Sequence, residues 1–190
     1  MGSATPLFDH DGPPGFDYRR GFISETEERA LLDAISNTTF STFEMRGVVA
    51  RRRVAFFGES YDRGAAQPLP DFLLPLRERI AAWARVEQDA FAMALINEYP
   101  PGAPIGWHRD APQYDIVAGV SLRSECRMRF RPYRSPAAAV TTTAKRTATH
   151  EIMLERRSAY LMTGESRTSF EHQIPPVTQL RYSVTFRTLR

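Results

Sequence analysis

Cysteine is almost absent from the sequence, and Cys126 has no second cysteine in the chain with which to form a disulfide. Disulfide frameworks and cysteine-rich zinc sites are therefore excluded, and such sparse use of cysteine fits a reducing compartment, so we expect a cytoplasmic protein. Long apolar runs are missing too, since no stretch reaches the roughly 18 residues of a membrane span. The first residues show neither the basic nor the apolar part of a signal peptide, and we expect no membrane association.

The composition is that of a soluble globular protein, with 42% hydrophobic and 25% charged residues in a chain of 190. We expect one monomeric domain at 21–190, preceded by an irregular arm at 1–20 that is rich in proline, glycine and aspartate. The net charge of +3 is unevenly spread. Arginines cluster at 51–53 and within 127–134, which suits either contact with a phosphate backbone or a solvated strand face.

Two helices are predicted in the first half of the chain. The first covers 24–37 and begins with a capping box, in which Ser24 and Glu27 satisfy each other's backbone groups. The second covers 71–88 and is amphipathic, with Pro75 in its first turn or at a kink.

Short strands dominate the rest of the sequence. A flexible hairpin loop is expected at 135–149, where the composition is of low complexity. Strands are expected as a pair within 39–57 that turns near Gly47, and singly at 90–99, 114–123, 126–133, 150–163 and 180–190. This order of elements favours a mainly β (α+β) sandwich or barrel flanked by N-terminal helices.

The segment "WHRDAPQYD" holds a histidine and an aspartate one residue apart. In an extended segment, His108 and Asp110 point to the same side and can share one metal ion. Iron centres of the facial-triad type need one more histidine and keep open positions for other ligands. His172, just ahead of the last strand, is a better third ligand than His10 or His150. A chance pair or a surface ion pair is the alternative that this pattern leaves open.

The last strand, "RYSVTFR", carries two arginines on one face. Alternation places Arg181, Ser183, Thr185 and Arg187 on the same side of the strand. Arginine is costly to bury unless an anion pairs with it, and a dicarboxylate cosubstrate would supply one. An exposed edge strand with two solvated arginines is the alternative.

These segments together resemble the AlkB family of iron(II)- and 2-oxoglutarate-dependent dioxygenases. That family combines Asn-x-Tyr, His-x-Asp, a distal His and a final Arg-x-Asn-x-Thr-x-Arg strand. The resemblance covers roughly 20–190, and the motifs occur in the same order in this chain. The matching residues are Asn97, Tyr99, His108, Asp110, His172, Arg181, Thr185 and Arg187. Ser183 departs from the pattern, because the family usually has asparagine there.

The resemblance implies a double-stranded β-helix (jelly roll) in which His108, Asp110 and His172 bind iron(II). It implies that Arg181, helped by Tyr99, pairs with the distal carboxylate of the cosubstrate 2-oxoglutarate. The remaining cosubstrate contacts that it implies come from Asn97, Ser183, Thr185 and Arg187. With dioxygen, AlkB-like enzymes oxidatively demethylate N-alkylated bases of the 1-methyladenine and 3-methylcytosine type, releasing formaldehyde and succinate.

A nucleotide-recognition lid is expected at about 40–64, where the arginine-rich segment resembles the lids of DNA-repair members. Arginines for phosphates and aromatic rings for base stacking are what an enzyme needs to bind a flipped base in alkylated DNA or RNA. The candidates are Arg51, Arg52, Arg53, Phe57 and Tyr61, with Phe56 as a further stacking surface. Alternation places at least one of the two phenylalanines in the core.

Pro112 marks a second departure, because repair members usually carry an acidic residue at this position, near the base. Gln113 or Asp115 could take over that contact. Two further functions therefore stay open: a 2-oxoglutarate-dependent hydroxylase or demethylase of a protein or small molecule, and a basic binding module without catalytic activity.

Overall fold

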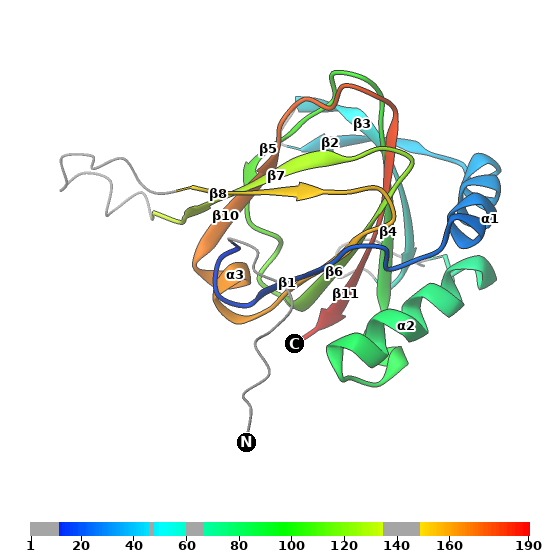
Figure 1. Ribbon diagram of the computed structural model, residues 1–190, viewed down its shortest axis with the longest axis horizontal. Helices are drawn as coiled ribbons and strands as arrows, with labels where there is room; N and C mark the ends of the chain where they lie inside the picture. Colours follow the sequence, from blue (N-terminus) through cyan, green and yellow to red (C-terminus); the bar gives the residue numbers. More distant parts are fainter. Residues whose placement is uncertain (1–11, 46–47, 60–66, 135–148) are drawn as a thin grey trace.

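Two antiparallel sheets face each other in the computed structural model, which describes residues 12–45, 48–59, 67–134 and 149–190 (Figure 1). The seven-stranded sheet has the order β1-β9-β6-β11-β4-β3-β2 and the four-stranded sheet the order β5-β10-β7-β8. The large sheet comprises β1 (Phe16–Arg19), β9 (Ala159–Met162), β6 (Tyr114–Leu122), β11 (Arg181–Leu189), β4 (Met93–Tyr99), β3 (Val48–Gly58) and β2 (Ser41–Met45). The small sheet comprises β5 (Ile105–His108), β10 (Phe170–Ile174), β7 (Cys126–Pro132) and β8 (His150–Leu154). This is the mainly β jelly roll that the sequence predicts.

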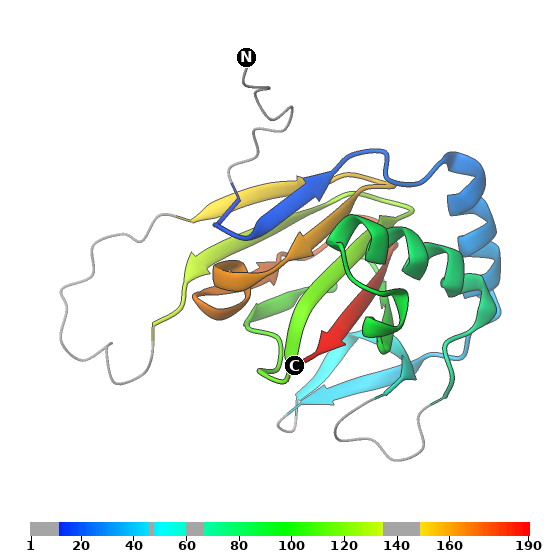
Figure 2. The same ribbon diagram turned by 90° about the horizontal axis from the view of Figure 1, so that it is seen from below.

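Two helices cover the face of the large sheet that points away from the small sheet (Figures 1 and 2). The first is α1 (Glu25–Ser36), whose predicted capping box is confirmed, since the Ser24 Oγ accepts from the Glu27 amide and Glu27 accepts from the Ser24 amide. The second is α2 (Leu74–Ala84), which follows the 3-10 turn η1 (Asp71–Leu73) and precedes η2 (Gln88–Ala90). The short α3 (Gly164–Thr168) lies beside β10.

Alternation along the central strands divides the interior into two cores. Ile96 of β4 and Val184 and Phe186 of β11 are fully buried under the helices. Leu95 and Tyr99 of β4 point the other way, into the core between the two sheets. Residues 181, 183, 185 and 187 also point between the sheets, so the interior placement predicted for the last strand is confirmed and the exposed-edge alternative is wrong.

The arm expected to be irregular through residue 20 contains strand β1, which is a correction to the sequence prediction. Phe16 and Tyr18 are buried between the sheets while Asp17 and Arg19 are exposed, so this short stretch has the period of two that fits an edge strand. It pairs antiparallel with β9, with Phe16 opposite Met162.

Two other predicted elements are shorter than expected. The helix predicted at 71–88 ends at Ala84, because Arg85 adopts the left-handed conformation with φ of 59°. The strand predicted at 150–163 is divided into β8 and β9, which lie in different sheets, and Arg157 between them also has a positive φ of 66°.

The hairpin predicted within 39–57 is formed by β2 and β3, which pair antiparallel. Its turn near Gly47 and most of the loop predicted at 135–149 lie outside the described residues. None of the described helices has the length and apolar character of a membrane span.

Candidate active site

Two histidines face each other across neighbouring strands of the small sheet. His108 ends β5 and pairs with His172 of β10 in the antiparallel register. Their ring centroids lie 4.2 Å apart. The strand pairing therefore brings together residues that are 64 positions apart in the sequence (172 minus 108).

Asp110 lies just beyond the end of β5 and completes the group. Its Oδ2 is 3.7 Å from Nε2 of His172. Its Oδ1 accepts from Arg187 at 3.0 Å, and Arg167 approaches Oδ2 to 3.6 Å without a hydrogen bond. Oδ2 is thus buried and has no hydrogen-bond partner among the described residues. A buried carboxylate oxygen with a free lone pair beside an imidazole nitrogen suits a bound cation.

The protonation states favour metal binding as well. Burial lowers the pKa of His172 to about 3, helped by the neighbouring His108. Burial alone would raise the pKa of Asp110, but Arg187, the two histidines and Arg167 outweigh it and hold that pKa below its usual range. A neutral imidazole and an ionised carboxylate are the forms that ligate metals.

The Nδ1 of His108 lies 2.9 Å from the carbonyl oxygen of Gly106. With a proton on Nδ1, this contact orients the ring and leaves the Nε2 lone pair for a metal. Within the described residues, no three His, Cys, Asp or Glu side chains are already drawn into a complete metal site. His108, Asp110 and His172 line one cavity, but their ligand atoms are not yet close enough to one another to coordinate a single metal ion.

The same cavity contains a buried arginine whose donors are largely unused. Arg181 is 1% exposed, and its Nη2 donates to the Ser121 hydroxyl at 2.9 Å. Its Nε and Nη1 are buried without a hydrogen-bond partner in the described structure. Tyr99 lies beside it, with its ring centroid 5.0 Å from the guanidinium carbon. An anion at this point would satisfy both idle donors, so the residues fit a carboxylate of 2-oxoglutarate.

A chain of polar side chains connects the two ends of the cavity. The Asn97 amide donates to Ser183 at 3.4 Å and accepts from Nε of Arg52 at 3.2 Å. Arg187 donates to Thr185 at 3.1 Å in addition to Asp110. The guanidinium of Arg187, expected to contact the cosubstrate, donates to Asp110 in this structure.

A cavity of about 60 Å³ between the sheets holds this group of side chains. Its polar lining residues include Arg52, Asn97, Tyr99, His108, Asp110, His172, Arg181, Ser183, Thr185 and Arg187. His150 is not among its lining residues: it lies on β8 with its ring 5.7 Å from that of Phe170. His10 lies outside the described residues.

The structure separates the predicted lid residues onto two faces of β3. Arg52 points between the sheets and lines the cavity, with its guanidinium 4.1 Å from the Phe43 ring, and burial lowers its pKa. Arg53 points the other way and forms an ion pair with Glu98. Arg51 is exposed and donates to the Gly102 carbonyl at 3.4 Å. The three arginines therefore do not form one phosphate-binding row, because neighbours in a strand point to opposite faces.

Phe57 is wrongly predicted as a stacking surface. It is buried in the core beneath the helices and takes no part in the cavity. Phe56, on the opposite face, is only partly buried and packs against the core between the sheets. Tyr61 lies outside the described residues.

Three residues that the sequence did not single out contribute to the site. Arg167 of α3 is 5% exposed and donates to three carbonyls of the 111–115 segment, which orders the chain after Asp110. Tyr160 lines the cavity, and a Cβ on Gly119 would lie 2.3 Å from its ring. A glycine inside the strand "IVAGVSL" is the one sequence signal for this close approach.

The two residues expected to replace the acidic contact at Pro112 do not reach the cavity. Pro112 itself is exposed, and neither Gln113 nor Asp115 lines the cavity. Asp115 instead approaches Arg190 at 3.9 Å on the surface.

The family model of the 2OG-Fe(II) oxygenase superfamily matches this chain over residues 56–187, which is more than half of its length. The chain belongs to that superfamily. It is therefore a 2-oxoglutarate-dependent dioxygenase that uses iron(II), 2-oxoglutarate and dioxygen.

Its curated relatives are AlkB homologues, which confirms the resemblance in the sequence motifs. An "Alkylated DNA repair protein ALKBH8 homolog" of Arabidopsis thaliana is 29% identical over 85% of this chain and 51% of that protein. A "Probable RNA/DNA demethylase ALKBH6" of Danio rerio is 27% identical over 89% of this chain and 73% of that protein. The chain spans about half the length of the Arabidopsis relative.

Solved structures confirm the jelly-roll fold. OsALKBH1 superimposes with a TM-score of 0.62 at 16% identity, over 93% of this chain and 99% of that one. A prolyl hydroxylase from Trichoplax adhaerens superimposes with a TM-score of 0.65 at 14% identity, over 92% and 83%.

Proposed function

We propose that this dioxygenase removes alkyl groups oxidatively from N-alkylated bases, of the 1-methyladenine and 3-methylcytosine type, in DNA or RNA. The observation that carries the proposal is the cavity. It is lined by His108, His172 and Asp110, whose buried Oδ2 has no hydrogen-bond partner among the described residues, and by the buried Arg181, whose Nε and Nη1 have none there either. The printed names of the relatives, an alkylated DNA repair protein homolog and a probable RNA/DNA demethylase, support the substrate class.

In this proposal His108, Asp110 and His172 hold iron(II), which with 2-oxoglutarate and dioxygen supplies the oxidising chemistry. Arg187 keeps Asp110 ionised and fixes the direction of Oδ1, so that Oδ2 is left to the metal. Arg167 holds the backbone that follows Asp110 and adds positive charge at 3.6 Å from Oδ2. These contacts prearrange the carboxylate before the metal arrives.

Arg181 receives the distal carboxylate of 2-oxoglutarate through its Nε and Nη1 atoms. The hydroxyl of Ser121 holds the third nitrogen, and Tyr99 closes the cavity beside it. Burial excludes water from this pair, which strengthens the attraction between the guanidinium and the carboxylate. Asn97 and Ser183 continue the polar lining toward the iron end.

Arg52 is the candidate residue for contact with the substrate. It reaches the cavity from β3, in the predicted lid, and its Nε donates to Asn97. A guanidinium at this point can donate to a base edge or to a phosphate of a nucleotide that enters from the lid side. Arg53, tied to Glu98 on the other face, cannot make the same contact.

The test is a panel of methylated single- and double-stranded DNA and RNA oligonucleotides, assayed by mass for loss of methyl and by release of formaldehyde. The proposed function requires demethylation of at least one oligonucleotide, coupled to succinate formation. Turnover of 2-oxoglutarate with peptides or small molecules, and with none of the oligonucleotides, would instead assign the enzyme to the alternative class.

Two matched variants locate the substrate contact. Arg52→Gln is expected to slow demethylation roughly tenfold or more, the size expected for losing one charged hydrogen bond of about 1.5–3 kcal/mol. Arg53→Gln, one residue away and on the opposite face, serves as its control and is expected to leave the rate within about twofold. Equal effects of the two changes would contradict the assignment of Arg52.

A further inference from the structure

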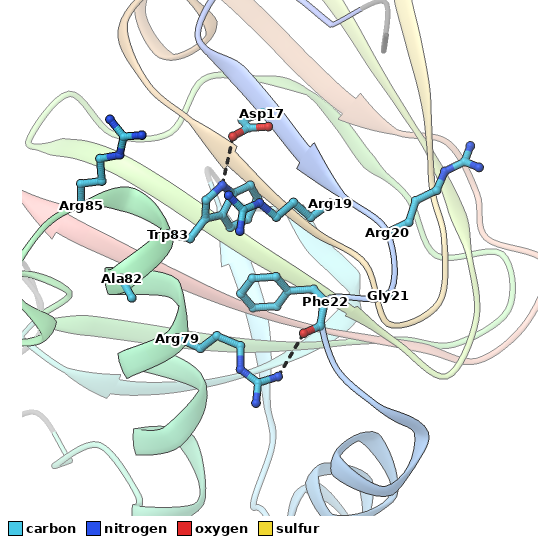
Figure 3. A pocket seen from close by; sticks show the side chains of 9 residues that line it. All are labelled: Asp17, Arg19, Arg20, Gly21, Phe22, Arg79, Ala82, Trp83 and Arg85. Carbon is cyan, nitrogen blue, oxygen red and sulfur yellow. Dashed lines mark hydrogen bonds between the residues drawn. The ribbon is translucent and has the colours of Figure 1, made fainter. Parts of the chain in front are cut away.

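A second hollow lies on the opposite side of the large sheet from the active cavity. Figure 3 shows the side chains that line this hollow. This cleft has a volume of about 660 Å³ and is bounded by β1 with the residues that follow it on one side and by α2 on the other. Asp17 and Arg19 project into it from the face of β1 opposite to the buried Phe16 and Tyr18. The candidate iron site, which lies between the two sheets, does not contribute to it.

The cleft has an aromatic base and a strongly positive rim. Trp83 and Phe22 pack with ring centroids 5.3 Å apart, and Asp17 accepts from the Trp83 indole at 3.0 Å, as drawn in Figure 3. Its lining holds four arginines and a single carboxylate; the arginines are Arg19, Arg20, Arg79 and Arg85. A cleft of this composition attracts anions.

Two of the four arginines have their charge neutralised within the protein. Arg79 forms an ion pair with Glu27 and donates to the Phe22 carbonyl at 3.0 Å. Arg20 approaches Glu155 to 3.3 Å. These contacts give both side chains a structural role.

Arg19 and Arg85 have no ion-pair partner among the described residues. The guanidinium of Arg19 lies over Trp83, 4.6 Å from the ring centroid, in a cation–π contact that leaves its charge without a carboxylate partner in the described residues. Arg85 projects from the end of α2 and is exposed. The positive charges of Arg19 and Arg85 are therefore available to an anion bound in the cleft.

The backbone of Arg85 adds an independent observation. It is left-handed at the end of the helix, with φ of 59°, a conformation that glycine adopts without strain and that residues with a Cβ adopt rarely. Arg123 and Arg157 share this conformation, but the Arg123 amide and the Arg157 guanidinium both bind Glu28. Glu28 therefore supports the left-handed conformation at Arg123 and Arg157, whereas no hydrogen bond or ion pair to a carboxylate supports it at Arg85 in the described structure.

We propose that this cleft binds the phosphodiester backbone of the nucleic-acid substrate, away from the target nucleotide, with Arg19 and Arg85 contacting phosphates. This inference rests on the proposed function. Because the cleft and the iron site lie on opposite faces of the large sheet, a nucleic-acid strand that contacts both has to run around the sheet. We therefore expect a methylated trinucleotide to bind at the iron site only, and longer substrates to gain affinity from the cleft.

The test is a double variant that removes both charges while keeping the fold. Arg85→Gly relieves the left-handed backbone, and Arg19→Gln keeps most of the side chain over Trp83. The control, Arg29→Gln with Arg127→Gln, removes the same charge from α1 and β7, where Glu25 and Glu151 already pair with these arginines. Binding of a long oligonucleotide and of the trinucleotide is measured against salt concentration by fluorescence anisotropy.

For the long oligonucleotide, the double variant is expected to bind more weakly and to lose about two units of the slope of log K against log salt, close to one unit per phosphate contact. Its binding of the trinucleotide is expected to equal that of the unaltered protein. Identical slopes for the double variant and the control overturn the proposal. So does a loss of binding to phosphatidylglycerol vesicles with unchanged binding of the oligonucleotide, which would assign the arginines to a membrane surface.

These measurements need no turnover, so they separate the two proposals. A protein that demethylates the trinucleotide while its cleft variants bind every oligonucleotide normally keeps its proposed function and loses this inference. A protein that demethylates nothing loses the proposed function, whatever the salt slopes show. Trp83 gives a local check: in a Trp107→Phe background it is the remaining tryptophan of the two, and its fluorescence is expected to change only when the long oligonucleotide binds.

Discussion

Two buried carboxylates in this protein lie beside arginines, and they differ in whether both of their oxygen atoms accept hydrogen bonds. Glu28 lies fully buried on α1, where Oε1 accepts from the Arg123 amide at 2.8 Å and Oε2 accepts from Arg156 at 2.7 Å. Asp110 is also buried beside two arginines, but its Oδ2 has no hydrogen-bond partner in the part of the chain that the structure describes. Burial and positive neighbours are therefore common to both, and the unused lone pair is what distinguishes a proposed metal ligand from a structural ion pair.

The largest expected difference between the two carboxylates appears when each loses its charge: one change affects turnover and the other affects stability. Asp110→Asn is expected to reduce 2-oxoglutarate turnover more than about 100-fold, beyond the loss usual for residues that only support a ligand. Glu28→Gln is expected to lower the free energy of unfolding by about 1.5–3 kcal/mol, because it weakens the hydrogen bonds that the buried carboxylate accepts from the Arg123 amide and from Arg156. Turnover per folded molecule, with folding followed by circular dichroism, separates the two effects. Equal loss of turnover in both variants would show that Asp110 has no special role.

Two histidine variants test which imidazole accompanies Asp110. His172→Ala is expected to abolish retention of iron through gel filtration, because the cavity offers no spare ligand. His150→Ala, on β8 of the same sheet but outside the cavity, is expected to retain iron like the unaltered protein. The third ligand is misassigned if the two variants behave the other way round.

A change at Arg181, at the cosubstrate end of the cavity, is expected to affect turnover less than the loss of a metal ligand. Arg181→Lys keeps the positive charge but loses the forked donors that match a carboxylate, so the 2-oxoglutarate concentration for half-maximal turnover is expected to rise about tenfold. Iron affinity is expected to change little, since Arg181 does not touch the histidines. An unchanged 2-oxoglutarate requirement would point to another basic side chain as the partner of the distal carboxylate.

The smallest predicted effect concerns pH in the metal-free protein. Burial lowers the pKa of His172 to about 3, whereas in the unfolded chain it is about 6.5, so the unfolded state binds a proton that the folded state does not. Stability should therefore rise with pH in this range, by about 1 kcal/mol between pH 5.5 and 7 from this residue. Urea unfolding of the unaltered protein and of His172→Gln at both pH values measures the difference. A dependence of the same size in the variant would contradict the assignment to His172.

The site could be predicted from the sequence where the spacing itself carries the chemistry. The i, i+2 spacing of His108 and Asp110 and the alternation of Arg181 and Arg187 are local patterns, and a sheet converts them directly into a shared face. The direction of a strand face is a different matter. Alternation in β3 shows that Arg52 and Arg53 diverge, but only tertiary packing decides that Arg52 points inward and that Phe57 lies under the helices.

Two of the mispredicted boundaries share one physical cause. Arg85 ends α2 and Arg157 separates β8 from β9, and both adopt the left-handed backbone that normally marks glycine or asparagine. A sequence reading expects a helix or strand to continue through arginine, which is a good former of helices and carries no turn signal. The two breaks are consequently imposed by the tertiary structure, through contacts such as the one between Arg157 and Glu28.

The four residues of β1 also bear on how the protein behaves in concentrated solution. They cover the outer edge of β9, whose backbone groups would otherwise be free to pair with a sheet from another molecule. As the new edge, β1 is short and alternates Asp17 and Arg19 on its exposed face, which discourages such pairing. A version of the protein trimmed to residue 20 would therefore keep every residue of the cavity and yet be prone to aggregate through β9.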